Sequence, residues 1–446
     1  MDSMEVKPVA EFCLRPSSPT PPHLRYLKLS LLDHLLPCPY ATVVFFYTGD
    51  RRLNLEKRLE ILRDSLSRAL TKLYPLAGKV KDDHTVDCND EGLRYLEAQV
   101  NCDISDFLRQ PDLLAAHKFL PAVNTAISHV ANVQVNVFKC GGMAIGLCIS
   151  HKVLDGAGIG AFMNEWAAAA RGEAGGPQPD FSLAAAFPAE SLWLKEAAPR
   201  IWGPLFKPGN FITKRFVFES SSVAKIRQEA SATCLSPDRP PTRIEAVSAL
   251  IWKVFMHVRK ENNNGVSNPS TLTHLVNLRP RAKAIIPAIT DRSLGNMLWV
   301  AISEAVEEAR PGLGILSEKV RAGIAKIDGG FVAKLRGADE SEVRRHALGS
   351  LGGIADQGLD VIAFTSWCRL GFYEADFGWG RPVWVSSLGV QASVFFNVVL
   401  LVDTVDGEGV EAWVNLDEKD MEVFQRNADV RRLTSVDPSP LDHQVV

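Results

Sequence analysis

The chain has 446 residues, which is more than one hydrophobic core usually serves, so two domains are expected. With 46% hydrophobic and 23% charged residues, its composition is that of an ordinary soluble globular protein. The net charge of −3 removes the electrostatic reason to expect nucleic acid or an anionic membrane as a partner.

The cysteines and the first residues favour a cytoplasmic protein. The eight cysteines are scattered, mostly inside apolar runs, and none forms a C-x-x-C pair. That usage is typical of reduced thiols packed as small hydrophobic groups. Residues 1–7 lack an apolar core of signal-peptide length, and no later run is long and uncharged enough to span a bilayer. We therefore expect a protein of the cytoplasm with no membrane partner.

The first part of the chain mixes strands and helices. The continuous β-prone run 42–47 predicts a strand that is buried on both faces. Leucines and alanines at helical spacing predict a long amphipathic helix over 55–73, which ends at Pro75. Short strands within 80–100 and a short helix over 111–120 are expected next.

A predicted hairpin delivers one histidine to a loop. Alternating apolar residues in 133–137 and 143–149, with a turn at 139–142, predict two antiparallel strands. Apolar residues at helical spacing then predict a helix over 159–170. His151 therefore lies where a rigid strand meets a glycine-rich loop. Such a position holds a side chain firmly and leaves it accessible.

The composition changes over residues 172–210, where glycines and prolines predict a linker between two domains, 1–171 and 211–446. Beyond the linker, strands and helices are mixed without strict βαβ alternation, which favours an α+β fold of two sheet domains. A charged helical stretch over 317–345, broken near Gly329, is expected on the surface. The other predicted elements are strands over 214–218, 271–278, 394–402 and 410–416 and helices over 222–230, 243–258 and 418–433.

Three interpretations of the segment 149–156 compete. In the plainest, His151 is a hydrogen-bonded histidine and Asp155 caps the following helix. In the second, residues 156–161 form G-x-G-x-x-A, and Asp180 stands where a dinucleotide fold places its ribose acid. The preceding hairpin argues against this one, because a dinucleotide fold needs a parallel unit. In the third, His151 is a general base and Asp155 shapes its loop.

Common catalytic motifs do not help to choose, since the sequence holds no G-x-S-x-G, H-E-x-x-H, P-loop or C-x-x-C. A second unusual stretch, 365–382, contains Asp376-Phe377-Gly378-Trp379-Gly380. Its glycines permit tight dihedral angles and its aromatic residues favour packing. This stretch is therefore expected to be architecture rather than chemistry.

The combination of H-x-x-x-D-G at 151–156 and D-F-G-W-G at 376–380 resembles the plant BAHD acyltransferases, which transfer acyl groups from coenzyme A. Further segments resemble that family along nearly the whole chain, at 73–79, 276–281 and 294–296.

The opening segments, as far as Asp33, look most like the branch of the family that contains vinorine synthase and related alcohol acetyltransferases. Two positions depart from the pattern. Arg381 stands where the family more often has lysine, and Leu294 stands where it often has an aromatic residue.

The resemblance implies an α+β fold of two chloramphenicol acetyltransferase-like domains, each a mixed β-sheet with helices. An active-site channel would run between them, with coenzyme A entering one side and the acceptor the other. The resemblance also implies no metal and no tightly bound cofactor. The co-substrate would be an acyl-CoA, with acetyl-CoA as the expected donor.

Roles for single residues follow from the same resemblance. His151 would be the general base that deprotonates an acceptor hydroxyl, because an unperturbed imidazole titrates near neutral pH. Asp155 would point away from the site and pair with an arginine, for which Arg279 is the first choice and Arg281 the reserve.

The resemblance places the remaining candidates around this histidine. Trp367, with Thr365 nearby, would line the acceptor side and donate its indole N–H to the oxyanion. Ser248 and Asn296 would contact the coenzyme. Asp376 and Gly378 would support the structure.

The expected function is transfer of an acyl group, in the first instance acetyl, from acyl-CoA to a hydroxyl of a plant specialised metabolite. The acceptor would be a terpenoid, an alkaloid or another alcohol, and the enzyme a monomer. An amine acceptor, or a longer aliphatic or aromatic donor, is an alternative on the same fold. Rivals from other classes are an NAD(P)-dependent oxidoreductase and a metabolite-binding relative without activity.

Overall fold

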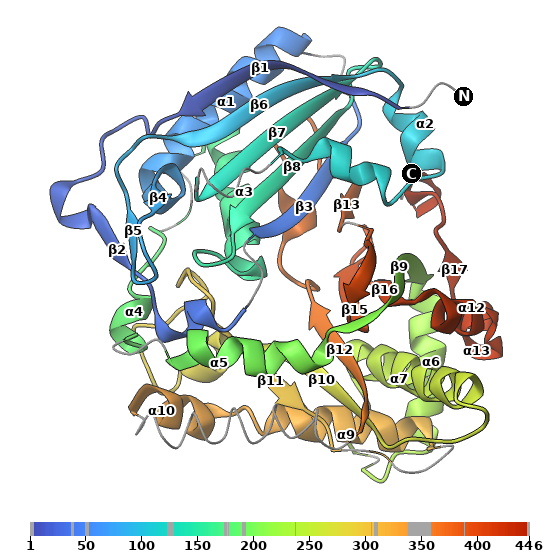
Figure 1. Ribbon diagram of the computed structural model, residues 1–446. Helices are drawn as coiled ribbons and strands as arrows, with labels where there is room; N and C mark the ends of the chain where they lie inside the picture. Colours follow the sequence, from blue (N-terminus) through green and yellow to red (C-terminus); the bar gives the residue numbers. More distant parts are fainter. Residues whose placement is uncertain are drawn as a thin grey trace.

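The described residues of the computed structural model form three β-sheets, the larger two of six and eight strands, with helices packed on them (Figure 1). The predicted α+β fold is confirmed. The structure describes residues 4–36, 40–49, 53–122, 129–173, 176, 178–189, 193–236, 238–304, 306, 311–337, 358–387 and 389–443.

The first large sheet has the strand order β1-β6-β7-β8-β3-β13 and is drawn mostly in blue and teal in Figure 1. The predicted hairpin is present as β7 and β8, which pair antiparallel and are buried along their whole length. Its strands are β1 (Val6–Leu14), β3 (Tyr40–Tyr47), β6 (Leu93–Val100), β7 (Ala131–Phe138), β8 (Met143–Ser150) and β13 (Trp384–Ser386).

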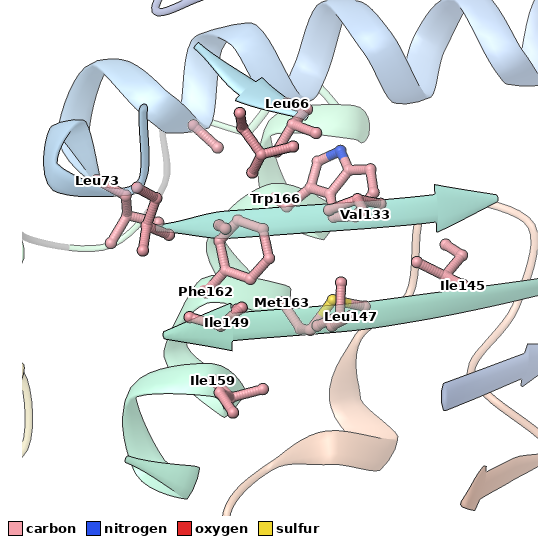
Figure 2. Packing of buried hydrophobic residues seen from close by; sticks show 14 of the residues in the cluster. Leu66, Leu73, Val133, Ile145, Leu147, Ile149, Ile159, Phe162, Met163 and Trp166 are labelled. Carbon is pink, nitrogen blue, oxygen red and sulfur yellow. The ribbon is translucent and has the colours of Figure 1, made fainter. Parts of the chain in front are cut away.

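Two helices cover one face of this sheet. The predicted long helix is α1 (Leu55–Lys72), and the helix after the histidine loop is α3 (Gly156–Ala170). Figure 2 shows Leu66 and Trp166 packed against Val133 and Leu147, with the Trp166 indole nitrogen among these apolar side chains. That nitrogen donates to the Leu62 carbonyl at 3.0 Å. The hairpin pairs residues 143–149 of β8 with residues 137–131 of β7, and this register sets the place where β8 ends.

The second large sheet has the order β11-β10-β12-β15-β16-β9-β14, with β17 paired to β9. One face is covered by α6 (Ser220–Ala232), α7 (Arg243–Asn262) and α9 (Leu313–Ala325). Its strands are β9 (Lys207–Phe218), β10 (Ser270–Asn277), β11 (Leu298–Ile302), β12 (Asp360–Ser366), β14 (Gln391–Phe395), β15 (Val398–Asp403), β16 (Val410–Asp417) and β17 (Ser435–Val436).

The remaining elements are short. A small sheet joins β2 (Tyr26–Lys28), β4 (Lys79–Val80) and β5 (Thr85–Asp87). The other helices are α2 (Ile104–Arg109), α4 (Leu183–Ala186), α5 (Trp193–Trp202), α8 (Arg279–Ala282), α10 (Gly329–Gly337), α12 (Glu418–Arg426) and α13 (Ala428–Leu433), together with short 3-10 helices.

Several predicted elements were wrong in detail near the C-terminus. The single strand expected over 394–402 is two strands, because the chain leaves β9 after β14 and pairs with β12 and β16 as β15. The single helix expected over 418–433 is α12 and α13. Asn427 is not helical, and its side chain caps α13 by accepting from the Asp429 amide at 3.0 Å.

Two further expectations need correction. The helix over 111–120 is a 3-10 helix, Ala115–Phe119. In the stretch 317–345, α9 is amphipathic and only one of its faces is at the surface, because Leu316 and Val320 are buried against α7. Its second part is α10, and residues 338–345 lie outside the described residues.

The predicted linker, 172–210, is folded in its described part. Leu194 of α5 packs in a core with Leu32 and Trp299, and the indole N–H of Trp202 donates to the Leu35 carbonyl at 2.7 Å. The stretch therefore packs against the second sheet and against the segment before β3. In addition, β13 from the C-terminal part completes the first sheet. The division into domains 1–171 and 211–446 stays a prediction.

The protein is expected to lose stability against unfolding in mild acid, because two of its histidines are buried. His34 and His274 each have a buried Nε2 with no hydrogen-bond partner among the described residues. Burial lowers the pKa of His274, and burial with nearby Lys152 lowers that of His34 to about 4. Unfolded histidine titrates near 6.5, so between these values the unfolded chain binds more protons and stability falls as pH falls.

We expect His34 to contribute a loss on the order of 2 kcal/mol between pH 7 and pH 4.5, measured as the free energy of unfolding in urea. His34→Gln should show a smaller loss, whereas the exposed control His23→Gln should behave as the wild type does. Equal pH dependence in both variants would contradict this assignment.

Candidate active site

His151 lies directly after the buried strand β8 and before α3. The turn is closed by the amides of Val153 and Leu154, which donate to the Ser150 carbonyl at 2.9 and 3.3 Å. The rest of the loop is shaped by Asp155, whose side chain accepts from the Gly158 amide at 2.9 Å and caps α3. The half-buried imidazole is thus anchored by both elements and borders a cavity.

Asp155 does not face His151 as a relay partner, because its carboxylate is used elsewhere. Arg279 donates to both of its oxygens, from Nη1 to Oδ2 at 2.7 Å and from Nη2 to Oδ1 at 3.1 Å. Oδ2 also accepts from the Met297 amide at 3.1 Å. Asp155 and Arg279 are 1% and 2% exposed, so this is a buried ion pair that ties α3 to the start of α8.

Arg281, the reserve for this pair, lies elsewhere. Its guanidinium donates to the backbone carbonyls of Asn277, at 2.8 Å, and Ile327, at 2.5 Å. Burial among these neutral groups lowers its pKa. It therefore braces the backbone and leaves Arg279 as the partner of Asp155.

Asn296 fixes the tautomer of His151. The Nδ2 group of Asn296 donates to the His151 backbone carbonyl at 2.5 Å and to Asp33 Oδ1 at 2.9 Å. Both partners are acceptors, so the amide orientation is determined and Asn296 Oδ1 must face His151 Nδ1, 3.0 Å away. His151 then carries its proton on Nδ1 and leaves the lone pair on Nε2.

The protonation state suits a base. Burial lowers the pKa of His151, and the neighbouring charge of Asp155 acts in the opposite direction as a smaller cause. The neutral form therefore predominates at pH 7, and Nε2 is ready to accept a proton.

The cavity at His151 has a volume of about 80 Å³ and mixed walls. Leu36, Leu275 and Leu298 supply apolar surface. Thr365 and Trp367, at and just beyond the end of β12, supply polar groups on the same cavity. The structure thus brings the predicted His151, Thr365 and Trp367 together.

A second and larger cavity, of about 870 Å³, shares Ser366 and Trp367 with the first. Its rim carries the arginines 227, 243, 369 and 381 and also acidic residues of the turn after β15. Arg243 is paired with Asp403, whereas Arg227, Arg369 and Arg381 are exposed. Trp367 therefore stands where the smaller cavity meets the larger one.

Gly160 lets α3 close against the loop that carries Trp367. A Cβ atom added at Gly160 would lie 2.1 Å from the Leu370 carbonyl oxygen, far inside contact distance. We expect Gly160→Ala to displace this loop, to lower kcat/KM for the reaction at His151 by about tenfold and to lower stability by about 1–3 kcal/mol.

Gly203→Ala is the matched control, since nothing lies within 4 Å of its added Cβ atom. Steady-state kinetics and urea unfolding of both variants check the prediction. Wild-type kinetics for Gly160→Ala would show that this contact does not position the loop.

The other predicted residues lie outside both cavities. Asp376 Oδ1 accepts from the amides of Gly378 and Gly380 at 2.7 and 3.0 Å, and both glycines have positive φ. This turn places Phe377 in the first core and leads into β13, as an architectural motif does.

Ser248 lies fully buried in α7, and its Oγ finds no hydrogen-bond partner among the described residues. It is thus a core residue beneath the second sheet. The structure gives it no contact with either cavity.

The dinucleotide interpretation does not fit the geometry. β8 pairs antiparallel with both β7 and β3, so no parallel unit precedes the glycines. The Gly158 amide is used by Asp155, and Gly160 is closed by Leu370. Asp180 accepts from Ser293 Oγ at 2.9 Å and holds the loop before β11.

Sequence reasoning missed two features of this site. It assigned Asn296 to the coenzyme, whereas the structure places it against His151, and it gave no role to Asp33. The pattern Ser30-x-x-Asp33 is a capping signature, which signals a helix start but not a contact with a distant residue.

The described residues show no cluster of three or more His, Cys, Asp or Glu side chains suited to a metal ion. None of the described helices is both long enough and apolar enough to cross a bilayer.

Comparisons with known proteins agree on one family. A model of the Transferase family matches residues 4–430. Limonoid 7-O-acetyltransferase of Citrus sinensis is 37% identical, over 96% of this chain and 98% of its own. The crystal structure of vinorine synthase is 30% identical with a TM-score of 0.78, over 97% of this chain and 99% of its own.

A more distant structure shares the fold. It is TRI101 of F. sporotrichioides, complexed with coenzyme A and T-2. It is 16% identical with a TM-score of 0.70, over 92% of this chain and 99% of its own.

Proposed function

Because this chain belongs to the Transferase family, the BAHD acyl-CoA-dependent acyltransferases, we propose that it moves an acetyl group from acetyl-CoA to a hydroxyl of a plant terpenoid or alkaloid, with His151 as the base. The observation that carries the proposal is the neutral His151, held with Nε2 unprotonated beside a cavity that Thr365 and Trp367 also line. No covalent acyl-enzyme is needed, because a thioester is already activated.

The reaction would follow a direct attack. His151 Nε2 takes the acceptor hydroxyl proton as the oxygen attacks the thioester carbonyl carbon. The tetrahedral intermediate carries its negative charge on the former carbonyl oxygen. It collapses with cleavage of the carbon–sulfur bond, and the imidazolium returns its proton to the departing sulfur, which gives the ester and free coenzyme A.

Trp367 and Thr365 are the proposed donors to the oxyanion. Both border the cavity at His151, and the Trp367 ring is held edge-on to Phe372 with 5.5 Å between ring centroids. A held indole N–H stabilises developing charge without reorganising at the moment of reaction. Asn296, in this proposal, positions His151 instead of contacting the coenzyme.

The larger cavity is the proposed coenzyme side. Its exposed arginines suit the phosphates of coenzyme A, since guanidinium groups bind phosphate oxygens through charge-assisted hydrogen bonds. Trp367 borders both cavities, so the thioester would reach His151 past this residue. The leucine-lined side would then receive the acceptor.

We expect Arg227→Ala to raise KM for acetyl-CoA about tenfold with little change in kcat, because one charge-assisted hydrogen bond to phosphate is lost. Initial rates at saturating acceptor check this. Arg426→Ala, an exposed arginine on α12, is the control and should keep the wild-type KM. Equal KM values for the two variants would remove Arg227 from the coenzyme site.

The described cysteines are free thiols, which supports a reducing compartment, and we propose a monomeric, cytoplasmic enzyme. The test of function is thiol release from acetyl-CoA with a panel of terpenoid, alkaloid and simple alcohols. Release that depends on an alcohol and yields its acetate ester is the expected result. Tryptophan fluorescence that responds to NADPH but not to acetyl-CoA, with no thiol release, would overturn the proposal.

A further inference from the structure

Asp33 is a buried carboxylate that uses both of its oxygens. It lies in the 3-10 helix Leu31–His34, between β2 and β3, and is 6% exposed. Oδ2 accepts from the amide and the hydroxyl of Ser30, both at 2.7 Å. Oδ1 accepts from the amide and the Nδ2 group of Asn296, at 2.8 and 2.9 Å.

Capping accounts for only half of these contacts. In a capping box the acidic side chain satisfies the local amide, which is what Oδ2 does at Ser30. That task needs one oxygen, and it is usually performed at the surface. Oδ1 instead reaches Asn296, which is 263 residues away in sequence and 1% exposed. A carboxylate buried for local capping would incur a desolvation cost without need.

The contact with Asn296 continues to His151. Asn296 is held at its backbone and its side chain by Asp33, and the same side chain contacts both the Nδ1 atom and the carbonyl of His151. Gly295, with φ of +127°, brings the Asn296 backbone to this position, and a Cβ atom there would lie 2.5 Å from Leu183 Cδ2. The three side chains form one hydrogen-bonded row that links the two halves of the chain.

We propose that Asp33 is a positioning residue for His151, acting through Asn296. This inference rests on the proposed function of His151 as the base. Asp33 holds the amide so that its oxygen faces Nδ1, which keeps the proton on Nδ1 and the lone pair on Nε2. When His151 takes the acceptor proton, the Asp33 carboxylate stabilises the imidazolium through the polarised amide.

The other charged groups near His151 are paired. The charge of Asp155 raises the pKa of His151, and the same carboxylate is paired with Arg279. Lys152 is paired with Asp83, which also pairs with Lys195.

Among the described residues, no cation pairs with Asp33. The hydrogen-bond partners of its carboxylate there are Ser30 and Asn296, both neutral. The adjacent His34 is uncharged near pH 7, because burial and nearby Lys152 lower its pKa to about 4. Burial raises the pKa of Asp33, whereas the hydrogen bonds that it accepts from Asn296 and Ser30 act in the opposite direction and favour its charged form.

Asp33→Asn tests the proposal, because an amide cannot accept from both Ser30 and Asn296 without opposing an N–H to an N–H. We expect kcat to fall about 10- to 100-fold, a size typical of lost supporting contacts, with KM for acetyl-CoA within twofold of wild type. The acid limb of the kcat/KM profile should move to lower pH, because the imidazolium loses its stabilising charge. Ser30→Ala is the matched control. It removes one capping contact but leaves Oδ1 on Asn296, so its kcat should stay within threefold of wild type.

A double-mutant cycle separates this role from a merely structural one. In an Asn296→Ala background, Asp33→Asn should add less than a threefold further loss of kcat, since its route to His151 is gone. The proposal would be overturned if the double variant lost kcat by the product of the two single losses. A kcat/KM pH profile for Asp33→Asn that matches the profile of Ser30→Ala would also overturn it.

Nitrogen-15 NMR of the imidazole reads the tautomer without any substrate. The Nδ1–H form in the wild type and a mixture in Asp33→Asn are expected. An unchanged tautomer in the variant overturns the role of Asp33, whereas the expected tautomers in a protein that releases no thiol from acetyl-CoA overturn the proposed function instead.

Discussion

His151→Ala is expected to lower kcat for acetyl transfer by about 100- to 10 000-fold, the range that general-base catalysis contributes. The variant loses the group whose Nε2 accepts the acceptor proton, while the cavity formed by Leu275, Leu298 and Trp367 remains. Binding of acetyl-CoA should persist, because the arginines of the larger cavity are untouched. The loss therefore falls on kcat and not on KM.

Thermal unfolding should change little in this variant, because the half-buried His151 ring contacts a cavity instead of filling a core. His129→Ala, a half-buried histidine just before β7, is the matched control and should keep full activity. A His151→Ala enzyme with more than a tenth of wild-type kcat would refute the general-base role.

Arg279→Met should cost about 3–5 kcal/mol of unfolding free energy, because it leaves Asp155 buried without its partner. The guanidinium also donates to the carbonyls of Ser293 and Gly295 at 2.9 and 3.1 Å, so these groups lose their donors as well. Since Asp155 shapes the loop of His151 and caps α3, we expect activity to fall with stability.

Arg281→Met is the matched control, as it removes a guanidinium of similar position that binds carbonyls but no carboxylate. Arg281→Met should lower the free energy of unfolding by less than half as much as Arg279→Met does, when both variants are unfolded in urea. Asp155→Asn should retain the cap at Gly158 and lose activity chiefly through distortion of the loop. If the two arginine variants lost similar free energies of unfolding, the ion pair of Arg279 with Asp155 would not be the main contact that stabilises this loop.

The sequence predicted what depends on local periodicity. The hairpin of β7 and β8 and the helices α1 and α3 follow from apolar spacing, because each buries its apolar face against the first sheet. The position of His151 follows in turn, since this residue comes directly after the predicted strand. The choice of Arg279 over Arg281 came from resemblance, and the bidentate contact is what the structure adds.

Features that depend on distant contacts were not predictable. The change of partner between β14 and β15 occurs inside a continuous apolar run, and apolarity does not distinguish one sheet partner from another. α9 appeared charged, yet its buried stripe packs under α7. Asp33 gave a helix-capping signal, and its contact with Asn296 exists only because the fold joins segments 263 residues apart in the chain.

The central claim is that His151 acts as a neutral base whose pKa is lowered by burial. The pH dependence of kcat/KM for acetyl transfer, measured for wild type and His151→Ala, tests it most directly. The account predicts a wild-type rate that rises with pH through a single ionisation below 6.5, the ordinary value for histidine, and then becomes level. A wild-type rate that keeps rising above pH 8, or the same ionisation in His151→Ala, would contradict it.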